Sequence, residues 1–124
     1  MAAYDVAYDT VVCTEVLEHI EADLTVIENW KSGANCICSV PNFDFETHVR
    51  VFLTEEDVRC RYGDLIDIER IIRVARPLIR GRSVREYFRQ LCWNRDNPKR
   101  FMALLGYRTF DNLAGWFVFS GKRN

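Results

Sequence analysis

Two short apolar runs on either side of a segment with helical periodicity constrain the fold of this chain more than any other feature. The run from Asp9 to Thr14 is β-branched with little polar alternation, and Ala34–Val40 is a second apolar run. Such runs are typical of strands buried on both faces. From Glu15 to about Lys31, apolar residues recur at intervals of three and four, which predicts a helix ended by Gly33. Two strands joined by a helix form a βαβ unit, so we expect parallel pairing.

The rest of the sequence continues the alternation of strands and helices. Pro77 and Gly81 break the chain, and the expected order indicates one α/β domain over residues 1–124. The expected elements are a helix starting at Thr54 and closed by Gly63, a strand over 65–74, a helix from Ser83 to about Trp93, a helix from Pro98 to about Leu105, and a last strand over 116–120.

Composition excludes several classes of protein. The chain is 48% hydrophobic, which suits a domain with a buried core and not a disordered chain. No apolar run approaches the roughly 20 residues that a membrane span needs. Asp5 and Asp9 stand where a secretory signal would be basic and then apolar. The five cysteines are odd in number and lack paired C-x-x-C spacing, which favours reduced thiols over a disulfide scaffold or a zinc site. We therefore expect a cytoplasmic protein without membrane contact.

Charge is divided unevenly along the chain. Residues 1–57 carry twelve acids and two bases, a net charge of −10, whereas residues 58–124 carry six acids and fifteen bases, a net charge of +9. The basic part can form a face for an anionic partner such as a nucleic acid, or the two parts can neutralise each other after folding, which we favour. The arginines between residues 70 and 89 can bind phosphate or an acidic substrate, or lie against the acidic helix over 15–28. Those arginines are Arg70, Arg73, Arg76, Arg80, Arg82, Arg85 and Arg89.

Glu15, Glu18 and His19 are the most informative group of polar residues. They follow the first strand, at the end of the sheet where open α/β folds bind ligands. On a helix, offsets of three and four place the three side chains on one face. Carboxylates are also stabilised near a helix N-terminus. The alternative is a solvated first turn in which His19 is merely hydrogen-bonded.

The sequence from Thr10 to Ile20 (TVVCTEVLEHI), followed by Lys31-Ser-Gly33 and by SVPN at 39–42, resembles the second half of class I S-adenosylmethionine-dependent methyltransferases. In that family these segments are the fourth strand, the next helix and the fifth strand. HVRVF at 48–52 and WFVFSGK at 116–122 agree with this resemblance. It implies a Rossmann-like sheet in the order 4-5-7-6 with an antiparallel last strand and flanking helices. Residues 76–112 would be a helical insertion between the last two strands.

The family's Gly-rich cofactor loop and the acidic residue after its second strand have no counterpart in these 124 residues. The six glycines are scattered, and none forms G-x-G after a strand. The resemblance therefore implies about half of a cofactor site and little or no activity for this chain alone. It also turns strand 10–14 into an unprotected sheet edge. We expect this edge to pair in a homo-oligomer or with a complementary N-terminal half.

The resemblance assigns roles to single residues. Thr14 and Glu15 would line the S-adenosylmethionine pocket, His19 would be a base or contact the acceptor, and Asn42 would orient a small-molecule or sugar-like acceptor. His48 and Arg50 would lie over the same end of the sheet, with Arg50 in contact with substrate.

Two alternatives to this assignment stay open. Glu15, Glu18, His19 and His48 resemble the metal-binding quartet of small-RNA 2′-O-methyltransferases, in which a divalent ion polarises a ribose hydroxyl. The chain can also be a non-catalytic methyltransferase-like remnant or an interaction subunit.

Overall fold

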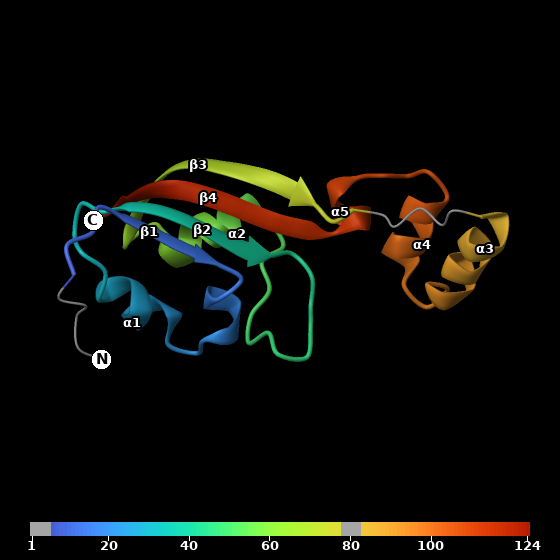
Figure 1. The fold of residues 1–124 in the computed structure, drawn as a ribbon, viewed down its shortest axis with the longest axis horizontal. Coiled ribbons are helices and arrows are strands. Elements are labelled where there is room, and N and C mark those ends of the chain that lie inside the picture. Colours follow the sequence, from blue (N-terminus) through green and yellow to red (C-terminus); the bar gives the residue numbers. More distant parts are fainter. Residues whose placement is uncertain (1–5, 78–82) are drawn as a thin grey trace. The chain divides into compact units, whose positions relative to one another are not determined.

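The computed structural model describes residues 6–77 and 83–124, and these residues form an α/β fold (Figure 1). Four strands make up one mixed, open sheet: β1 (Thr10–Thr14), β2 (Asn35–Pro41), β3 (Ile66–Ala75) and β4 (Gly115–Arg123). The helices are the 3-10 helix η1 (Leu17–His19), α1 (Asp23–Glu28), α2 (Glu55–Tyr62), α3 (Val84–Trp93), α4 (Pro98–Leu104) and α5 (Phe110–Leu113).

The strands lie in the order β1-β2-β4-β3. β1 and β2 are parallel, with Val12 opposite Ile37, and β4 runs antiparallel to β2. The predicted pair of neighbouring parallel strands joined by a helical segment is therefore confirmed. At the two ends of β3, the backbone N–H of Arg76 donates to the carbonyl of Ala114, and that of Asn124 donates to Leu65. β3 and β4 consequently run antiparallel.

One face of the sheet packs on helices and forms the core. Phe117 and Phe119 of β4 are buried on this face, and the ring of Tyr62 from α2 stacks on Phe119 with centroids 5.5 Å apart. Ile27 of α1 is also fully buried. In Figure 1 both α1 and α2 lie on the same side of the sheet. Such burial of aromatic and aliphatic side chains is the main source of stability for a layered fold.

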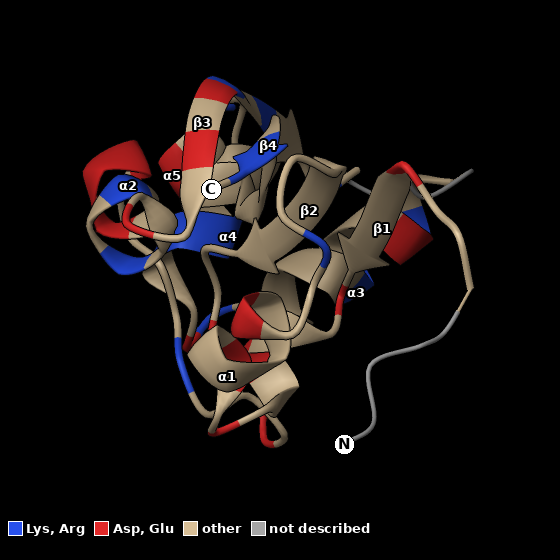
Figure 2. Ribbon diagram, turned by 90° about the vertical axis from the view of Figure 1, so that its left-hand side faces the viewer, with Lys and Arg blue, Asp and Glu red and all other residues tan. Residues whose placement is uncertain are grey.

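The start of α2 follows local sequence rules. Thr54 and Asp57 form a capping box, in which the Asp57 N–H donates to the Thr54 hydroxyl and the Asp57 carboxylate accepts from the Thr54 N–H. Acidic residues occupy the first turn and arginines the last turn, which complements the helix dipole (Figure 2). The predicted start at Thr54 and end at Gly63 are confirmed.

The helix predicted from Glu15 to Lys31 is wrong in its extent. Glu15 has a left-handed backbone (φ 58°), and Ile20 is extended, so only η1 and α1 are helical. The carbonyls of Leu17, Ile20 and Glu21 accept hydrogen bonds from the Arg50 guanidinium. Tertiary bonds have thus replaced the hydrogen bonds that a continuous helix would make. As a result, Glu15 does not share a helical face with Glu18 and His19.

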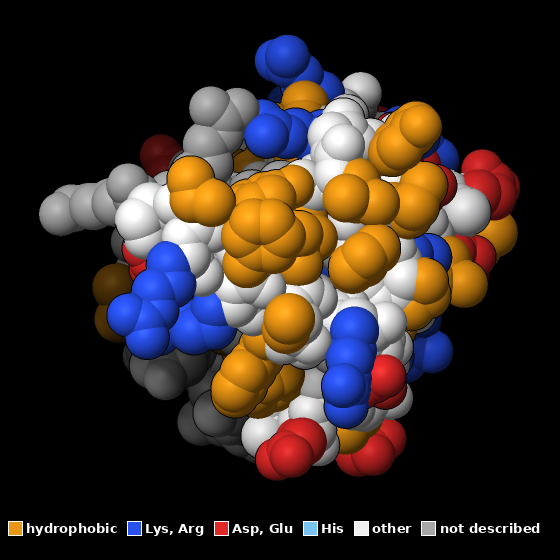
Figure 3. Space-filling model, turned by 90° about the vertical axis from the view of Figure 1, so that its right-hand side faces the viewer, with side chains coloured by type: hydrophobic (Ala, Val, Ile, Leu, Met, Phe, Trp, Pro, Cys, Tyr) orange, Lys and Arg blue, Asp and Glu red, His pale blue; other side chains and the backbone are white. Residues whose placement is uncertain are grey.

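The chain divides into two compact units: residues up to Arg73 together with Trp116–Asn124, and Val74–Gly115. The second unit holds α3, α4 and α5, whose N-caps are Ser83, Asn97 and Thr109. The predicted helices from Ser83 and Pro98 are confirmed, whereas α5 was not predicted. Apolar side chains gather on one exposed face (Figure 3), and in this unit Trp93 is 86% exposed. Whether 76–112 is an insertion relative to a family stays a prediction.

The ion pairs fit the expectation that the acidic and basic parts of the chain neutralise each other, and the cysteines fit the expectation of free thiols. Asp23 pairs with Arg61 and Glu55 pairs with Arg73, so acids of the first part of the chain bind arginines of the second. Arg89 pairs with Glu86 of its own helix, and Arg80 and Arg82 lie outside the described residues. All five cysteines are free. Within residues 6–77 and 83–124, no helix is long and apolar enough to cross a membrane.

Candidate functional site

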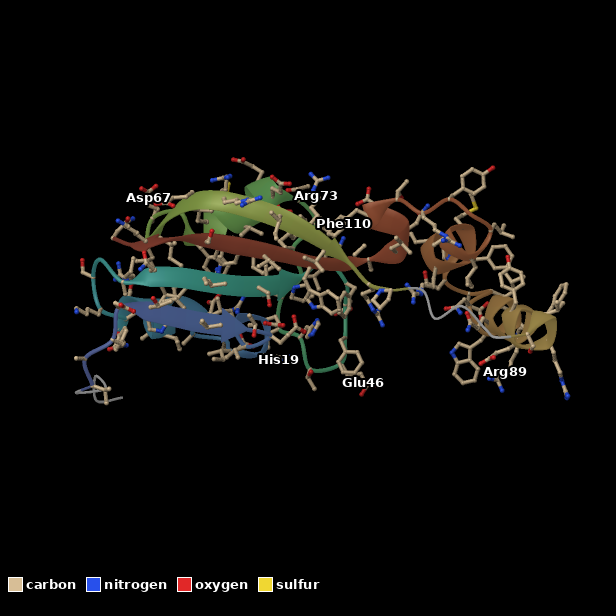
Figure 4. All side chains as sticks on the ribbon, turned by 45° about the horizontal axis from the view of Figure 1, so that its top comes forward. His19, Glu46, Asp67, Arg73, Arg89 and Phe110 are labelled. Carbon is tan, nitrogen blue, oxygen red and sulfur yellow. The ribbon has the colours of Figure 1, made fainter. Side chains whose placement is uncertain are left out.

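The loop between β2 and α2 folds back onto η1 and brings two histidines together. The Val49 N–H donates to the Glu18 carbonyl at 2.8 Å, and the His48 N–H closes a turn on the Phe45 carbonyl. The rings of His19 and His48 meet edge to face with centroids 4.9 Å apart. Figure 4 places His19 at the end of the sheet where β1 and β2 have their carboxyl ends. The two histidines, 29 positions apart in sequence, therefore form one site.

Both imidazoles are oriented by backbone carbonyls. His19 Nδ1 lies 2.9 Å from the Thr47 carbonyl oxygen, and His48 Nδ1 lies 3.2 Å from that of Phe43. A carbonyl oxygen can only accept, so Nδ1 carries the proton in each bond. In each neutral ring, Nε2 is then unprotonated and carries a lone pair. Each histidine thus presents a nitrogen that can take a proton or bind a metal ion.

Glu18 contributes a buried carboxylate to the same site. Its side chain is fully buried, and neither Oε1 nor Oε2 accepts a hydrogen bond from another described residue. Burial raises the pKa of the Glu18 carboxyl, and the negative charge of Glu15 raises it further. The backbone N–H of Glu18 and the two histidines act in the opposite direction, but the pKa stays above its usual value. A buried carboxylate with no hydrogen bond from another residue is costly in a protein interior.

Glu18, His19 and His48 are close enough to act on one ligand. One ligating atom of each residue can be chosen so that all three lie within 4.8 Å of one another. A carboxylate with two imidazoles can bind a divalent transition ion or transfer protons. Of the four residues in the predicted metal quartet, Glu15 is the one that lies outside this cluster.

Arg50 holds the segment that carries the site. Its guanidinium donates to the carbonyls of Leu17 and Ile20 at 2.6 Å and pairs with the buried Asp23 carboxylate at 3.1 Å. Arg61 and Tyr62 also donate to Asp23. Burial alone would raise the pKa of Asp23, but the bonds from Arg61 and Tyr62 and the charge of Arg50 lower it. These contacts give Arg50 a structural role, and its predicted contact with substrate stays a prediction.

The residues predicted to line the cofactor pocket lie at the carboxyl ends of β1 and β2. Thr14 and Glu15 are exposed at the end of β1. The Glu15 N–H donates to the Ser39 hydroxyl at 3.1 Å, and this hydroxyl lies 3.4 Å from Glu15 Oε1. Asn42 directly follows β2 and is half-buried. The structure therefore brings the predicted residues to one end of the sheet, and their chemical roles stay predictions.

Aromatic residues around His48 were not predicted. The Phe43 ring packs 5.6 Å from His48 and 5.6 Å from Trp116, and Phe45 packs 5.8 Å from His48. Asp44, Phe45, Glu46 and His48 line a shallow depression. The sequence signal was weak, because aromatic residues in a loop usually cover a core. Here Phe43 and Phe45 form an apolar surface beside the imidazole of His48.

In comparisons with known proteins, no protein-family model matches this chain, and no curated protein matches it.

Proposed function

We propose that this chain is the C-terminal half of an S-adenosylmethionine-dependent methyltransferase and supplies the acceptor side of its active site. The observation that carries this proposal is the parallel β1–β2 pair: Glu15 follows β1 in a left-handed turn, and His19 and His48, from the segments that follow β1 and β2, meet edge to face. A non-glycine residue in that conformation costs about 1–3 kcal/mol, and such strain clusters at functional sites. The order β1-β2-β4-β3, with an antiparallel β4, supports the resemblance.

The residues present fit one half of a cofactor pocket. Thr14 and Glu15 are exposed at the carboxyl end of β1, as residues that line a pocket must be. The 124 residues have no Gly-rich turn after a strand, so a second element must hold the rest of the cofactor. S-adenosylmethionine, when bound, supplies an electrophilic methyl group, so the protein needs only to position the acceptor and remove its proton.

His19 is the base that the geometry favours. Its Nδ1–H is held by the Thr47 carbonyl, which leaves the Nε2 lone pair for the acceptor proton. Its side chain is exposed, so an acceptor can reach it, whereas His48 is half-buried against Phe43. Asn42, which directly follows β2, would orient a small-molecule or sugar-like acceptor through its amide.

A titration with S-adenosylhomocysteine tests this proposal on the chain itself. We expect weak binding, with a dissociation constant on the order of 1 mM because only half of the pocket is present. NMR shifts of an isotope-labelled sample should be confined to Thr14, Glu15 and the residues around Asn42. Glu15→Gly removes the carboxylate and keeps the left-handed backbone without strain, so it should abolish these shifts.

Matched titrations separate cofactor recognition from general nucleotide binding. ATP shares the adenosine but lacks the thioether and amino-acid parts, and it should shift these residues much less. No shift at millimolar ligand, or shifts confined to another part of the chain, would contradict the cofactor assignment and favour the non-catalytic alternative.

The unpaired edge of β1 supports the proposal that an N-terminal half completes the sheet. Among the described residues β1 pairs with β2 alone, so its outer edge is unpaired. Val12 of β1 and its neighbour Ile37 of β2 are 66% and 41% exposed. They lie on the other face of the sheet from the one on which Phe119 is buried. Parallel sheets normally have both faces covered. We propose that a complementary N-terminal half covers this edge and face, and that a second copy of the chain does so when that half is absent.

The isolated chain is therefore expected to self-associate in a concentration-dependent way. Val12→Lys places a charge on the exposed edge strand and should shift the light-scattering mass toward the monomer. Val6→Lys is the matched control, because Val6 is equally exposed (67%) but lies outside the strand. A monodisperse monomer at high concentration in the unmodified chain would refute edge pairing.

A further inference from the structure

We infer that helix α3 binds to the surface of anionic phospholipid membranes, with its apolar side in the lipid and its arginines at the headgroups. This inference goes beyond methyl transfer, since it needs neither the cofactor nor an acceptor. It concerns the second compact unit, Val74–Gly115, and depends on three features: an amphipathic helix, an apolar side that the unit leaves uncovered, and an excess of positive charge.

The sequence of α3 places apolar and basic side chains on different sides of the helix. Its apolar residues recur at intervals of three and four, and such offsets lie on one side of an α-helix. Arg85 and Arg89 are four residues apart and share another side. A helix with arginine on its polar side and aromatic and aliphatic residues on the other is typical of segments that lie in a membrane interface. The apolar residues are Val84, Tyr87, Phe88 and Leu91.

The unit that contains α3 does not cover this apolar side. None of the α3 residues is buried, and Val84 and Phe88 are 73% and 61% exposed. The Tyr87 hydroxyl donates to the Leu104 carbonyl at 2.7 Å, so α3 is joined to α4 through Tyr87. In the described part of this unit, the buried apolar side chains are those of Ala103 and Leu104. Because a helix of ten residues is marginal without packing, α3 gains from a partner that covers its apolar side.

Charge indicates which partner fits this unit. Residues 74–115 carry nine bases and three acids, a net charge of +6. Figure 3 views the chain from the side of α3 and α4, and there hydrophobic side chains gather on one face with Lys and Arg side chains at its margins. Two copies of this unit would repel each other, whereas an anionic membrane attracts each Lys or Arg near its surface. The surface is therefore complementary to anionic headgroups next to hydrocarbon.

A membrane fits this surface better than a nucleic acid does. Aromatic side chains can stack on bases, but aliphatic ones cannot, and this unit exposes both kinds. Val84, Met102 and Leu105 are all exposed, and such groups are stabilised when they leave water for the acyl boundary. Our expectation of no membrane contact came from the absence of a spanning run. A helix that lies in the interface needs no such run.

Flotation of the full chain with phospholipid vesicles in a density gradient tests this inference. We expect the chain to float with phosphatidylcholine vesicles that contain about 30% phosphatidylserine, and to stay in the dense fraction with pure phosphatidylcholine. Phosphatidylglycerol should replace phosphatidylserine at the same mole fraction, because the surface recognises charge. Added NaCl should weaken the binding, since salt screens the attraction between the arginines and the headgroups.

Phe88→Gln tests the apolar contribution. It should weaken binding to the anionic vesicles about tenfold or more, because the aromatic ring no longer moves from water into lipid. Phe45→Gln is the matched control and should leave the affinity unchanged, since Phe45 is equally exposed (60%) but belongs to the other unit. Phe88→Trp keeps an aromatic ring, so it should bind like the unmodified chain, and lipids brominated on their acyl chains should quench its added fluorescence.

Arg85→Gln and Arg89→Gln test the basic contribution. Each should weaken binding about fivefold, the effect of one charge near an anionic surface. Arg70→Gln is the matched control, because it removes an exposed charge from β3 in the other unit and should leave the affinity unchanged. Circular dichroism of every variant should match that of the unmodified chain, which shows that a loss of binding is not a loss of fold.

Other outcomes overturn the inference. The chain would not bind anionic membranes if it failed to float with them, or if it floated equally with neutral vesicles. Flotation that survives Phe88→Gln, or no added quenching in Phe88→Trp, would show that α3 does not enter the lipid. A single-stranded oligonucleotide that binds the chain but not Phe88→Gln, while vesicles do not bind, would assign the surface to nucleic acid. These results do not depend on the S-adenosylhomocysteine titration, so either proposal can fail alone.

Discussion

Replacing Arg50 by methionine is expected to lower the free energy of unfolding by about 3–5 kcal/mol, the usual cost of removing one partner from a buried ion pair. Arg50 is only 16% exposed, and its pair with Asp23 is accompanied by bonds to three backbone carbonyls. Methionine keeps much of the apolar volume but leaves these acceptors without their donor. Domains of this size are stable by only about 5–15 kcal/mol, so the loss should be evident in urea unfolding followed by circular dichroism.

Arg73→Met is the matched control for that experiment. Arg73 pairs with Glu55 at 2.8 Å, but both side chains are substantially exposed, so solvent screens the pair. Exposed pairs contribute about 0–1 kcal/mol. Equal losses for the two variants, or a loss below about 1 kcal/mol for Arg50→Met, would show that Arg50 does not hold the η1 segment.

Gly121→Ala is expected to cost about 3 kcal/mol, at the upper end of the usual range for overpacking. Gly121 is buried in β4 opposite Cys36 of β2 and packs closely on β3. A Cβ at this position would fall inside contact distance of the Asp67 carbonyl oxygen and 2.8 Å from its carbonyl carbon. Backbone atoms within a sheet cannot yield as a flexible side chain would, so the strands must separate.

The neighbouring Ser120→Ala tests whether this cost belongs to the close approach. Ser120 lies in the same strand, points to the other face and is half-buried, so the substitution should change the free energy of unfolding by less than about 0.5 kcal/mol. Gly115→Ala, at a second close approach to Val74 and Ala75, should behave like Gly121→Ala. A Gly121→Ala chain as stable as Ser120→Ala would mean that β3 and β4 are further apart than described.

The strands and the helix starts could be predicted because local chemistry specifies them. The apolar runs at 10–14 and 35–40 favour strands, and the Thr54, Ser83 and Asn97 caps satisfy backbone N–H groups next to them. The prediction that both faces of these strands are buried was wrong, since Val12 and Ile37 are exposed. The pairing of β4 between β2 and β3 joins segments far apart in sequence. It entered our expectations through a family resemblance and not through any local pattern.

The segment from Glu15 to Ala22 could not be predicted, because its apolar spacing suits a helix that never forms. Arg50, roughly 30 residues later, takes the carbonyls that such a helix would use. Nothing near Arg50 in sequence indicates this contact. The same break buries Glu18 and leaves Glu15 outside the cluster, so the shape of the site follows from one long-range interaction.

By itself, the sequence determined which segments become strands, where helices begin, and which acid and imidazole groups follow the first two strands. These properties depend on side-chain shape and on hydrogen bonds over a few residues. Only the tertiary structure decided that His48 meets His19, that Glu18 is buried with no hydrogen bond from another described residue, and that Arg50 supports the segment that carries Glu18 and His19. These contacts arise when a loop folds back on a completed sheet, and their energies depend on burial, which no stretch of sequence contains alone.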